Sequence, residues 1–373
     1  RLGTARVVLV MVLALAAVKL VAVQTVQAGE LAAAAERQSR TDIRLPAERG
    51  SILDRFGNPL AFSVESRALV ANPRLLAQVK GPDTDNYARQ VAVSVAQATG
   101  EDAEAVYHQL TSDRGYVVLA SDVAPDVATA LQQQFPEITT EPRQAREYPG
   151  GSLAANLVGV ARWDPQSKKL TGLLGLESAQ DELLSGTEGR RVVDTAEGSS
   201  TIIPGSTRLD QPAIPGSDLQ LTIDSDLQFT VQRLLADAVQ RTGARGGSAV
   251  VLDSATAEVL AMANGATFDP RNLTGTTPDL LGNPAVTTPY EPGSVNKIVT
   301  VAAALEHGIA TPDRVLEVPG SIQVADRIIS DAWKHGVEHY TVTGILAMSS
   351  NVGTLLLARE VGEERFAEML TRF

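Results

Sequence analysis

Cysteine is absent from this chain of 373 residues, and lysine and histidine are scarce. Without cysteine the chain has no disulfide, no thiol nucleophile and no thiolate metal site. The net charge of −12 argues against a broad basic surface, so we expect no nucleic-acid partner. Lysine occurs six times against 26 arginines, and Lys297 is the only lysine between Lys169 and Lys334. This isolation fits a specific role for Lys297.

Lys297 ends the segment Ser294–Lys297, whose sequence is S-V-N-K. Pro292–Gly293 punctuates the chain before it and an apolar periodic run to Glu306 follows, so the pattern predicts a helix that starts at Ser294. Positions i and i+3 share a helix face, which points both polar side chains the same way. The apolar positions predicted to pack are Val295, Ile298, Val299, Ala302 and Leu305.

A serine and a lysine at this spacing can act together in catalysis. The hydroxyl needs a base within hydrogen-bond reach to become a nucleophile. A lysine can be that base when burial or neighbouring cations lower its pKa. By itself, however, S-x-x-K also occurs wherever a serine precedes a surface lysine on a helix.

A second motif, S-S-N at Ser349–Asn351, lies between helices predicted over 341–348 and 352–361. Alone, it is a common turn or helix-capping sequence. The order S-x-x-K and then S-x-N is typical of class A β-lactamases and penicillin-binding proteins, in which a K-T-G motif completes the set. The first two motifs occur here in that order.

The chain resembles the class B penicillin-binding proteins, most of all the division-type D,D-transpeptidases. Three further segments carry the resemblance in family order: 49–61 (R-G-S-I-L-D-R-F-G-N-P-L-A), 146–155 (R-E-Y-P-G-G-S-L-A-A) and 172–186 (G-L-L-G-L-E-S-A-Q-D-E-L-L-S-G). No K-T-G follows Asn351, and the similar K-H-G at 334–336 stands before S-x-N, in the wrong order. We therefore interpret the sequence as a fragment that lacks the third motif.

The resemblance implies roles for four residues. Ser294 would attack the D-Ala–D-Ala carbonyl of a stem peptide, and Lys297 would take its proton. Ser349 would relay a proton to the leaving nitrogen. Asn351 would bind the substrate amide and hold Lys297 in place. No cofactor and no metal are implied.

Other polar residues near the motifs have simpler interpretations. Ser350 is predicted to satisfy the local backbone. Asp331 lies before the second motif and could position the site, but turn preferences favour a structural role in a turn. His335 and His339 have the spacing of a helical metal pair, but Gly336 weakens the helix and H-E-x-x-H is absent, so we predict no metal site. The lack of G-x-S-x-G argues against an α/β-hydrolase.

The stretch Val7–Val26 is nearly continuous in apolar residues, and about 20 such residues span a bilayer. Arg1 and Arg6 precede it, so the positive-inside rule predicts a single-pass anchor in the cell membrane, with a cytoplasmic N-terminus and the bulk of the chain extracytoplasmic. The alternative is a signal peptide cleaved near 26–28, but the length of the run favours the anchor.

We expect an α+β fold in four parts: a cytoplasmic stub and transmembrane helix (1–26), a stalk (27–46), an irregular α+β pedestal or dimerisation-like module (47–210), and a partial penicillin-recognising serine transpeptidase, β-lactamase-like, domain (216–373). Proline and glycine crowd 204–216 and mark the boundary. The predicted elements are a strand–turn–strand at 49–71, helices at 87–99, 103–110, 122–135 and 225–241, strands at 190–194, 201–204 and 219–223, and a hairpin at 248–263.

The resemblance implies a serine enzyme that crosslinks peptidoglycan stem peptides in septal wall synthesis and is acylated by β-lactams. Its expected partners are a glycosyltransferase and division-complex proteins. Two alternatives stay open: an anchored, non-catalytic interaction module, and a D,D-carboxypeptidase or β-lactamase with water as acceptor. Because the third motif is missing, we expect the 373-residue chain alone to bind β-lactams poorly.

Overall fold

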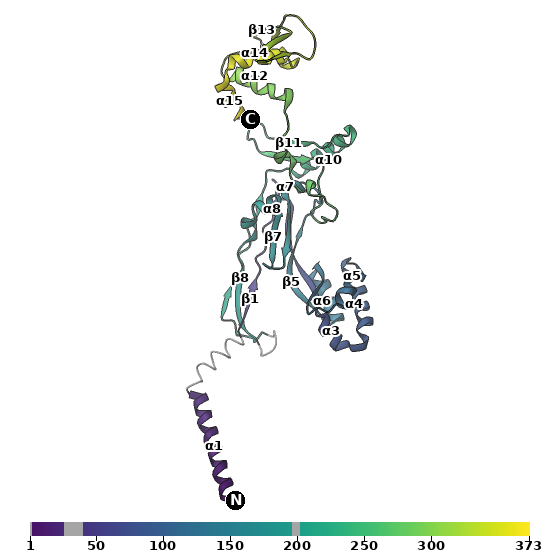
Figure 1. Ribbon diagram of the computed structural model, residues 1–373, viewed down its shortest axis with the longest axis vertical. Coiled ribbons are helices and arrows are strands. Elements are labelled where there is room, and N and C mark those ends of the chain that lie inside the picture. Colours follow the sequence, from purple (N-terminus) through teal and green to yellow (C-terminus); the bar gives the residue numbers. More distant parts are fainter. Residues whose placement is uncertain (1, 26–39, 196–201) are drawn as a thin grey trace. The chain divides into compact units, whose positions relative to one another are not determined.

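The computed structural model describes residues 2–25, 40–195 and 202–373 (Figure 1). The chain divides into two compact units, Arg1–Thr288 and Pro289–Phe373. Helices and strands occur in both, which confirms a mixed α and β composition. The division falls inside the transpeptidase domain predicted over 216–373.

The first helix, α1 (Leu2–Thr25), coincides with the apolar N-terminal run. Leu9, Leu13 and Leu20 on this helix are each more than half exposed. Over the described parts of the chain, no helix has both the length and the apolar character that crossing a membrane requires. The helix is therefore confirmed, and its role as a membrane anchor is not. Residues 26–39, which hold most of the predicted stalk, lie outside the described residues.

A five-stranded sheet is the framework of the first unit. Its long strand β3 (Pro59–Ala71) pairs antiparallel with β2 (Ile52–Leu53), β4 (Val117–Val123) and β5 (Ile138–Glu147), and β10 (Leu219–Gln220) joins β2 in parallel. The pairing of β3 with β5 is unbroken along β5, and the turn that leads into β3 is closed by Asp54, which accepts hydrogen bonds from the backbone of Phe56 and Asn58. The predicted strand–turn–strand at 49–71 is confirmed.

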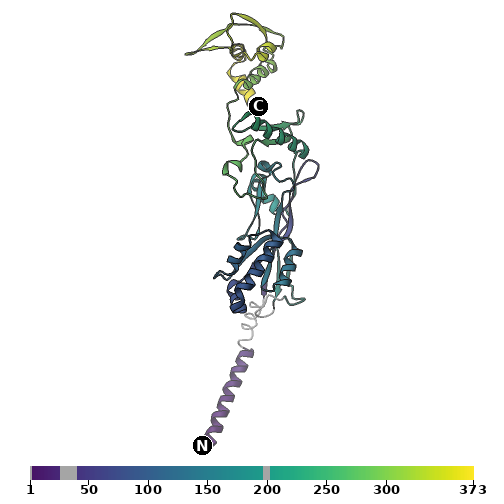
Figure 2. The same cartoon turned by 90° about the vertical axis from the view of Figure 1, so that its right-hand side faces the viewer.

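A helical cluster gathers at one end of this sheet (Figures 1 and 2). Asn72 and Asp102 begin two of its helices by accepting hydrogen bonds from backbone N–H groups of the first turn, the usual function of an N-cap. The elements of the cluster are α3 (Pro73–Lys80), η1 (Gly81–Asp83), α4 (Thr84–Thr99), α5 (Ala103–Leu110) and α6 (Pro125–Gln134). The core that they share with the sheet is aliphatic and includes Leu69, Val91, Leu110, Leu119, Leu131 and Ile138.

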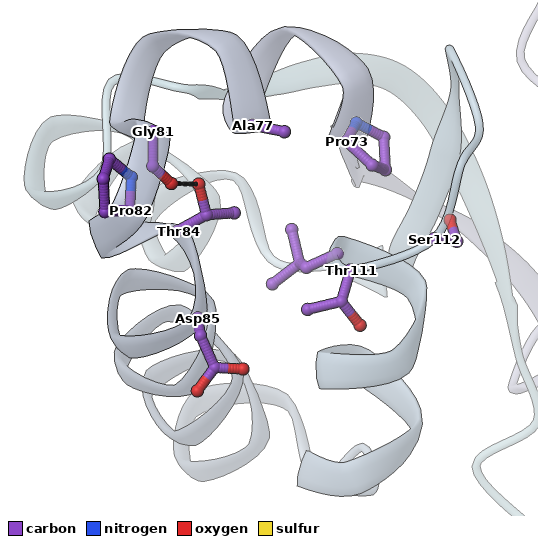
Figure 3. Close-up of a pocket in the computed structure, with 9 residues that line it drawn as sticks. Pro73, Ala77, Gly81, Pro82, Thr84, Asp85, Thr111 and Ser112 are labelled. Carbon is purple, nitrogen blue, oxygen red and sulfur yellow. Dashed lines mark hydrogen bonds between the residues drawn. The ribbon is translucent and has the colours of Figure 1, made fainter.

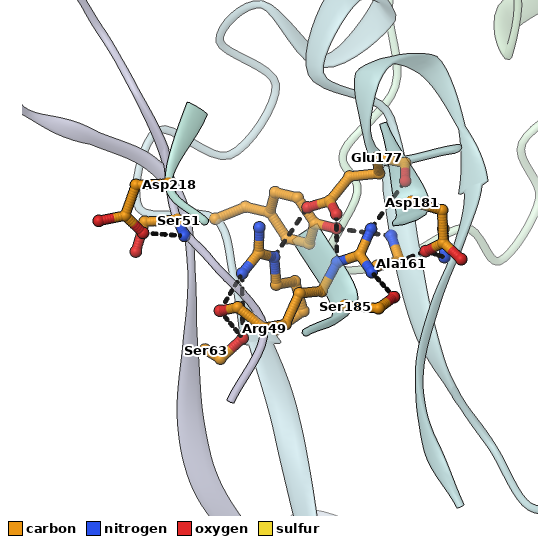
Figure 4. Close-up of polar contacts among 11 residues, drawn as sticks. Arg49, Ser51, Ser63, Ala161, Glu177, Asp181, Ser185 and Asp218 are labelled. Atoms are coloured by element: carbon orange, nitrogen blue, oxygen red, sulfur yellow. Dashed lines mark hydrogen bonds and ion pairs between the residues drawn. The ribbon is translucent and has the colours of Figure 1, made fainter. Parts of the chain in front are cut away.

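A buried ion network joins distant segments of the same unit (Figure 4). The carboxylate of Glu177, fully buried, lies 2.8 Å from Arg49 Nε and 2.7 Å from Arg146 Nε. Arg49 also contacts Asp181 at 2.7 Å. A buried charge is tolerated when it is paired and hydrogen-bonded, and here each of the segments 49–61, 146–155 and 172–186 supplies part of the network. The three segments that carry the family resemblance therefore meet in space.

Short elements surround this network. Gly172 has no room for a side chain, because an added Cβ would lie 1.8 Å from the carbonyl oxygen of Glu177. The helices are α7 (Ala155–Val158), α8 (Gly175–Ala179) and α9 (Asp181–Ser185), next to the hairpin β6 (Val160–Asp164) and β7 (Lys169–Leu174). A separate sheet has the order β1 (Arg40–Leu45), β8 (Gly189–Asp194), β9 (Leu209–Gln211).

The first unit ends with the predicted helix and hairpin. Helix α10 (Ser225–Thr242) starts at Asp224, whose carboxylate accepts from the N–H groups of Asp226 and Leu227. The strands β11 (Ser248–Leu252) and β12 (Val259–Asn264) pair antiparallel. The short turns η2 (Pro278–Leu280) and α11 (Pro284–Thr287) follow.

The second unit packs helices around an aliphatic core. Its helical elements are η3 (Gly293–Asn296), α12 (Lys297–Glu306), α13 (Val342–Ala347), α14 (Asn351–Val361) and α15 (Glu363–Leu370). Two antiparallel pairs accompany them, β13 (Val315–Val318) with β16 (Glu338–Thr341), and β14 (Ser321–Val324) with β15 (Arg327–Ser330). The core includes Val301, Ala304, Val318, Ile345, Val352 and Leu357.

Four predicted elements differ from the structure. The helix predicted at 122–135 begins only at Pro125, because residues 122 and 123 belong to strand β4. The helix predicted from Ser294 begins instead as a 3₁₀ turn with three residues per turn, so a packing face extrapolated at 3.6 residues per turn is out of phase. Of the predicted face, Val299 is buried and Ala302 packs on the core, whereas Val295, Ile298 and Leu305 are exposed.

The strand predicted at 219–223 is shortened to β10. The strand predicted at 201–204 is reduced to an isolated bridge at Ile202, and residue 201 is outside the described part.

Candidate active site

Ser294 lies in a tight turn at the start of the second unit. Gly293 precedes it with φ +57°, a left-handed conformation that suits glycine, and directs the chain into the 3₁₀ turn η3. Residues i and i+3 eclipse in a 3₁₀ helix, so Ser294 and Lys297 share one face, as predicted. Ser294 is exposed, and its hydroxyl makes no hydrogen bond among the described residues.

The amine of Lys297 is held by the second motif. Its Nζ donates to the Ser349 carbonyl oxygen at 2.5 Å, to Ser349 Oγ at 3.1 Å and to Asn351 Oδ1 at 2.7 Å. Since a lysine ammonium has three N–H donors, all three are used. The structure therefore brings Lys297, Ser349 and Asn351 together across 52 to 54 positions of sequence.

A Schellman helix end explains how Ser349 reaches this lysine. The N–H of Ser349 bonds to Leu346 O at 3.0 Å and the N–H of Ser350 bonds to Ile345 O at 2.9 Å, the two hydrogen bonds of that motif at the end of α13. Ser349 itself has φ +55°, where glycine is usual. The left-handed residue reverses the chain between α13 and α14, and this turn offers both the carbonyl and the hydroxyl of Ser349 to Lys297.

Ser350 and Asn351 begin the next helix. Ser350 is the N-cap of α14 and its hydroxyl accepts from the N–H of Gly353 at 2.9 Å, so the predicted local backbone contact is confirmed. The Asn351 amide is oriented from both ends, since Oδ1 accepts from Lys297 and Nδ2 donates to Ser330 O at 2.9 Å. Each end of this amide keeps further capacity for a substrate group.

Asp331 is the residue of this site that the sequence interpretation underestimated. It is only 7% exposed, and its carboxylate accepts from the N–H groups of Asn351 and Val352 and from Ser350 Oγ. These three partners lie 19 to 21 residues away, so Asp331 does not act only in a local turn. The position of an acid before the second motif was the available signal, but sequence alone does not reveal which distant helix it caps.

The histidines near the motif have no metal-site geometry. His335 lies 3.0 Å from Asp331 through Nε2, while His339 is exposed on β16. Within residues 2–25, 40–195 and 202–373, no cluster of three or more His, Asp or Glu side chains is placed to hold a metal ion.

The electrostatics favour a proton acceptor at Lys297. Burial lowers the pKa of the Lys297 amine, while the negative charge of Asp331 acts in the opposite direction. A lowered pKa raises the neutral fraction, which a general base requires. A neutral amine has two N–H donors and one lone pair. It can therefore keep its contacts with the Ser349 carbonyl and with Asn351 while it accepts a proton from a hydroxyl.

A cavity of about 290 Å³ in the helical cluster of the first unit is not a catalytic alternative (Figure 3). Its titratable side chain is Asp85, which already accepts from Tyr107 and from Arg89. Thr84 donates to the carbonyl of Gly81. No base lies beside a free nucleophile among the residues that line this cavity.

Comparison with known families identifies both parts of the chain. A model of the penicillin-binding protein dimerisation domain matches residues 44–221, and a model of the penicillin-binding protein transpeptidase domain matches residues 247–373. The chain belongs to the penicillin-binding proteins. The family resemblance drawn from the sequence motifs is thereby confirmed, as is a mixed α and β fold with a dimerisation and a transpeptidase domain.

Individual penicillin-binding proteins agree with this assignment. Penicillin-binding protein PbpB of Mycolicibacterium smegmatis is 45% identical over 390 residues, which cover 99% of this chain and 59% of the relative. Peptidoglycan D,D-transpeptidase FtsI of Escherichia coli is 32% identical, over a match that covers 88% of this chain and 54% of the relative. The crystal structure of penicillin binding protein 3 from Mycobacterium tuberculosis with aztreonam has a TM-score of 0.60 and 39% identity to this chain. The match covers 88% of this chain and 53% of that structure's chain. The chain thus spans little more than half the length of these relatives.

Proposed function

We propose that this chain carries the acylation site of a D,D-transpeptidase that crosslinks peptidoglycan stem peptides, with Ser294 as nucleophile. The observation that supports the proposal is the position of Lys297. It follows Ser294 by one 3₁₀ turn and contacts both functional members of the S-x-N motif, Ser349 and Asn351.

The proposed reaction begins with the neutral amine of Lys297, which takes the proton from Ser294 Oγ. The oxygen attacks the carbonyl carbon of the penultimate D-Ala, and the tetrahedral oxyanion receives a hydrogen bond from the Ser294 backbone N–H. Ser349 passes a proton to the amide nitrogen, the C–N bond breaks, and D-Ala leaves. An amine of a neighbouring stem peptide then attacks the ester, which forms the crosslink and frees Ser294.

Asn351 has two tasks in this scheme. Its Oδ1 holds the Lys297 amine, and the remaining N–H of its Nδ2 binds the substrate amide. β-Lactams would acylate the same serine. Support comes from the relative penicillin binding protein 3, whose structures are described as complexes with aztreonam and with ampicillin. The family resemblance further supports septal synthesis with a partner glycosyltransferase and division-complex proteins.

We also infer that the N-terminal segment anchors the chain in the cell membrane, with its bulk outside. The support is the apolar run 7–26 after Arg1 and Arg6, together with the exposed apolar side chains of α1. Carbonate extraction of membranes tests the anchor: the protein should stay in the pellet, and its release into the supernatant contradicts the inference.

Labelled penicillin tests the acylation proposal on the complete protein that contains these residues. Ser294→Ala should abolish covalent labelling, while Ser321→Ala, at an exposed serine of the same unit, should label like the wild type. Equal labelling of Ser294→Ala contradicts the assignment. Absence of label on the wild type favours the non-catalytic interaction module. Release of the acyl group to water without transfer to an added amine favours the carboxypeptidase or β-lactamase alternative.

A further inference from the structure

We propose that Asp331 is a positioning residue of the acylation reaction, because its buried carboxylate fixes the S-x-N loop at the place where Ser349 and Asn351 reach Lys297. This inference rests on the proposed function of Ser294. Asp331 would not touch the substrate in this role. It would act through the loop that holds the base.

The carboxylate of Asp331 has four partners in the second unit. Oδ1 accepts from the N–H of Asn351 at 2.5 Å and of Val352 at 3.1 Å. Oδ2 accepts from Ser350 Oγ at 2.8 Å and lies 3.0 Å from His335 Nε2. Its side chain is fully buried. Three of these partners are the two last residues of the motif and the residue that follows them, so the carboxylate is directed at the motif itself.

These bonds define the orientation of the loop. Backbone N–H groups at a helix N-terminus have no partner inside the helix, and a carboxylate there is stabilised by the positive end of the helix dipole. Because the Ser350 hydroxyl accepts from Gly353 and donates to Asp331, its direction is fixed as well. The backbone of Asn351 is held by Asp331, and its side chain is held by Ser330. The amide that binds Lys297 therefore has little freedom to move.

His335 holds the other side of the carboxylate. Its ring stacks on Trp333 with centroids 5.4 Å apart and meets Tyr340 edge-on at 6.3 Å. Its side chain is 2% exposed. The packed imidazole therefore presents Nε2 to Asp331. The carboxylate is thus fixed between this ring and the helix.

Asp331 also acts on Lys297 by charge. It is the one charged group that raises the pKa of Lys297 among the described residues, in opposition to the effect of burial. Removing this charge should leave the lysine neutral down to lower pH. This effect separates a positioning residue close to the base from a residue that only stabilises the fold.

The test compares acylation rates by labelled penicillin, across pH, in the complete protein. Asp331→Ala should slow acylation by about 100-fold, the order of loss expected when catalytic groups shift by about 1 Å. Asp331→Asn keeps one oxygen for the two backbone N–H groups and should be slowed less, with the acid limb of its profile moved to lower pH. Asp326→Asn, at an exposed hairpin position, should match the wild type.

The outcomes separate this inference from the proposed function. If Asp331→Ala folds and is acylated at the wild-type rate with an unchanged pH profile, positioning by Asp331 is refuted while Ser294 keeps its role. If Ser294→Ala is labelled like the wild type, the proposed function fails instead. If Asp331→Ala does not fold, Ser350→Ala decides: it removes one donor to the carboxylate, and wild-type rates in both Ser350→Ala and Asp331→Asn refute the inference.

Discussion

Because Ser349 has a left-handed backbone, we predict that two substitutions at this position differ in stability but are alike in activity. Ser349 occupies the position after α13 where a Schellman motif usually has glycine, with φ +55°. A residue with a Cβ costs about 1–2 kcal/mol in this conformation. Glycine avoids that cost but loses about 0.4–1 kcal/mol through the greater freedom of the unfolded chain. Ser349→Gly should therefore be more stable than Ser349→Ala by roughly 0.5–1 kcal/mol.

The pair of variants isolates the backbone term, because both lack the hydroxyl that contacts Lys297. Thermal unfolding of the transpeptidase domain should place Ser349→Gly about 1–4 °C above Ser349→Ala, since about 1 kcal/mol shifts the melting temperature of a domain of this size by a few degrees. Both variants should be slow to react with penicillin. A Ser349→Ala variant as stable as Ser349→Gly refutes the argument from backbone strain, and full acylation of either refutes the role of the hydroxyl.

Two further predictions concern the base and the buried network. Burial lowers the pKa of Lys297, and the base must be neutral, so the acylation rate of the wild type should rise with pH until the pH passes that lowered pKa. Lys297→Arg stays protonated and should be inactive at every pH. Activity in the arginine variant contradicts a base at this position. Glu177→Ala leaves two buried arginines without their shared partner, so it should lower the free energy of unfolding, measured in urea, by about 3–5 kcal/mol. Asp113 belongs to an exposed ion pair of the same 2.8 Å length, and Asp113→Ala should lower it by less than about 1 kcal/mol. If both substitutions lower the free energy of unfolding equally, burial does not make the Glu177 ion pairs stronger than an exposed pair.

Local sequence patterns predicted most of the secondary structure. The hairpin at 248–263 and the helices at 103–110 and 225–241 are found close to their predicted ends, because alternation, caps and apolar period agree there. The helix after Gly293 illustrates the limit. Its first turn winds as a 3₁₀ helix, and no periodicity over so few residues distinguishes the two helix types.

The candidate site was predictable only where short motifs exist. Ser294, Lys297, Ser349 and Asn351 follow from spacing and order, and the structure confirms that the last three meet. The sequence allows Asp331 to position the site but favours a turn role, because its hydrogen bonds depend on how β15 approaches the start of α14, which is a tertiary property. The meeting of Arg49 with Glu177 is likewise a contact over 128 positions that local patterns do not encode.

The account is tested most directly by locating the penicillin adduct on the complete protein. Tryptic digestion after Arg271 and Lys297 releases a peptide in which Ser294 is the only serine. Tandem mass spectrometry should find the added mass of the opened β-lactam on this peptide, at that residue. An adduct on any other side chain, or none after complete reaction with the reagent, contradicts the assignment of Ser294 as nucleophile.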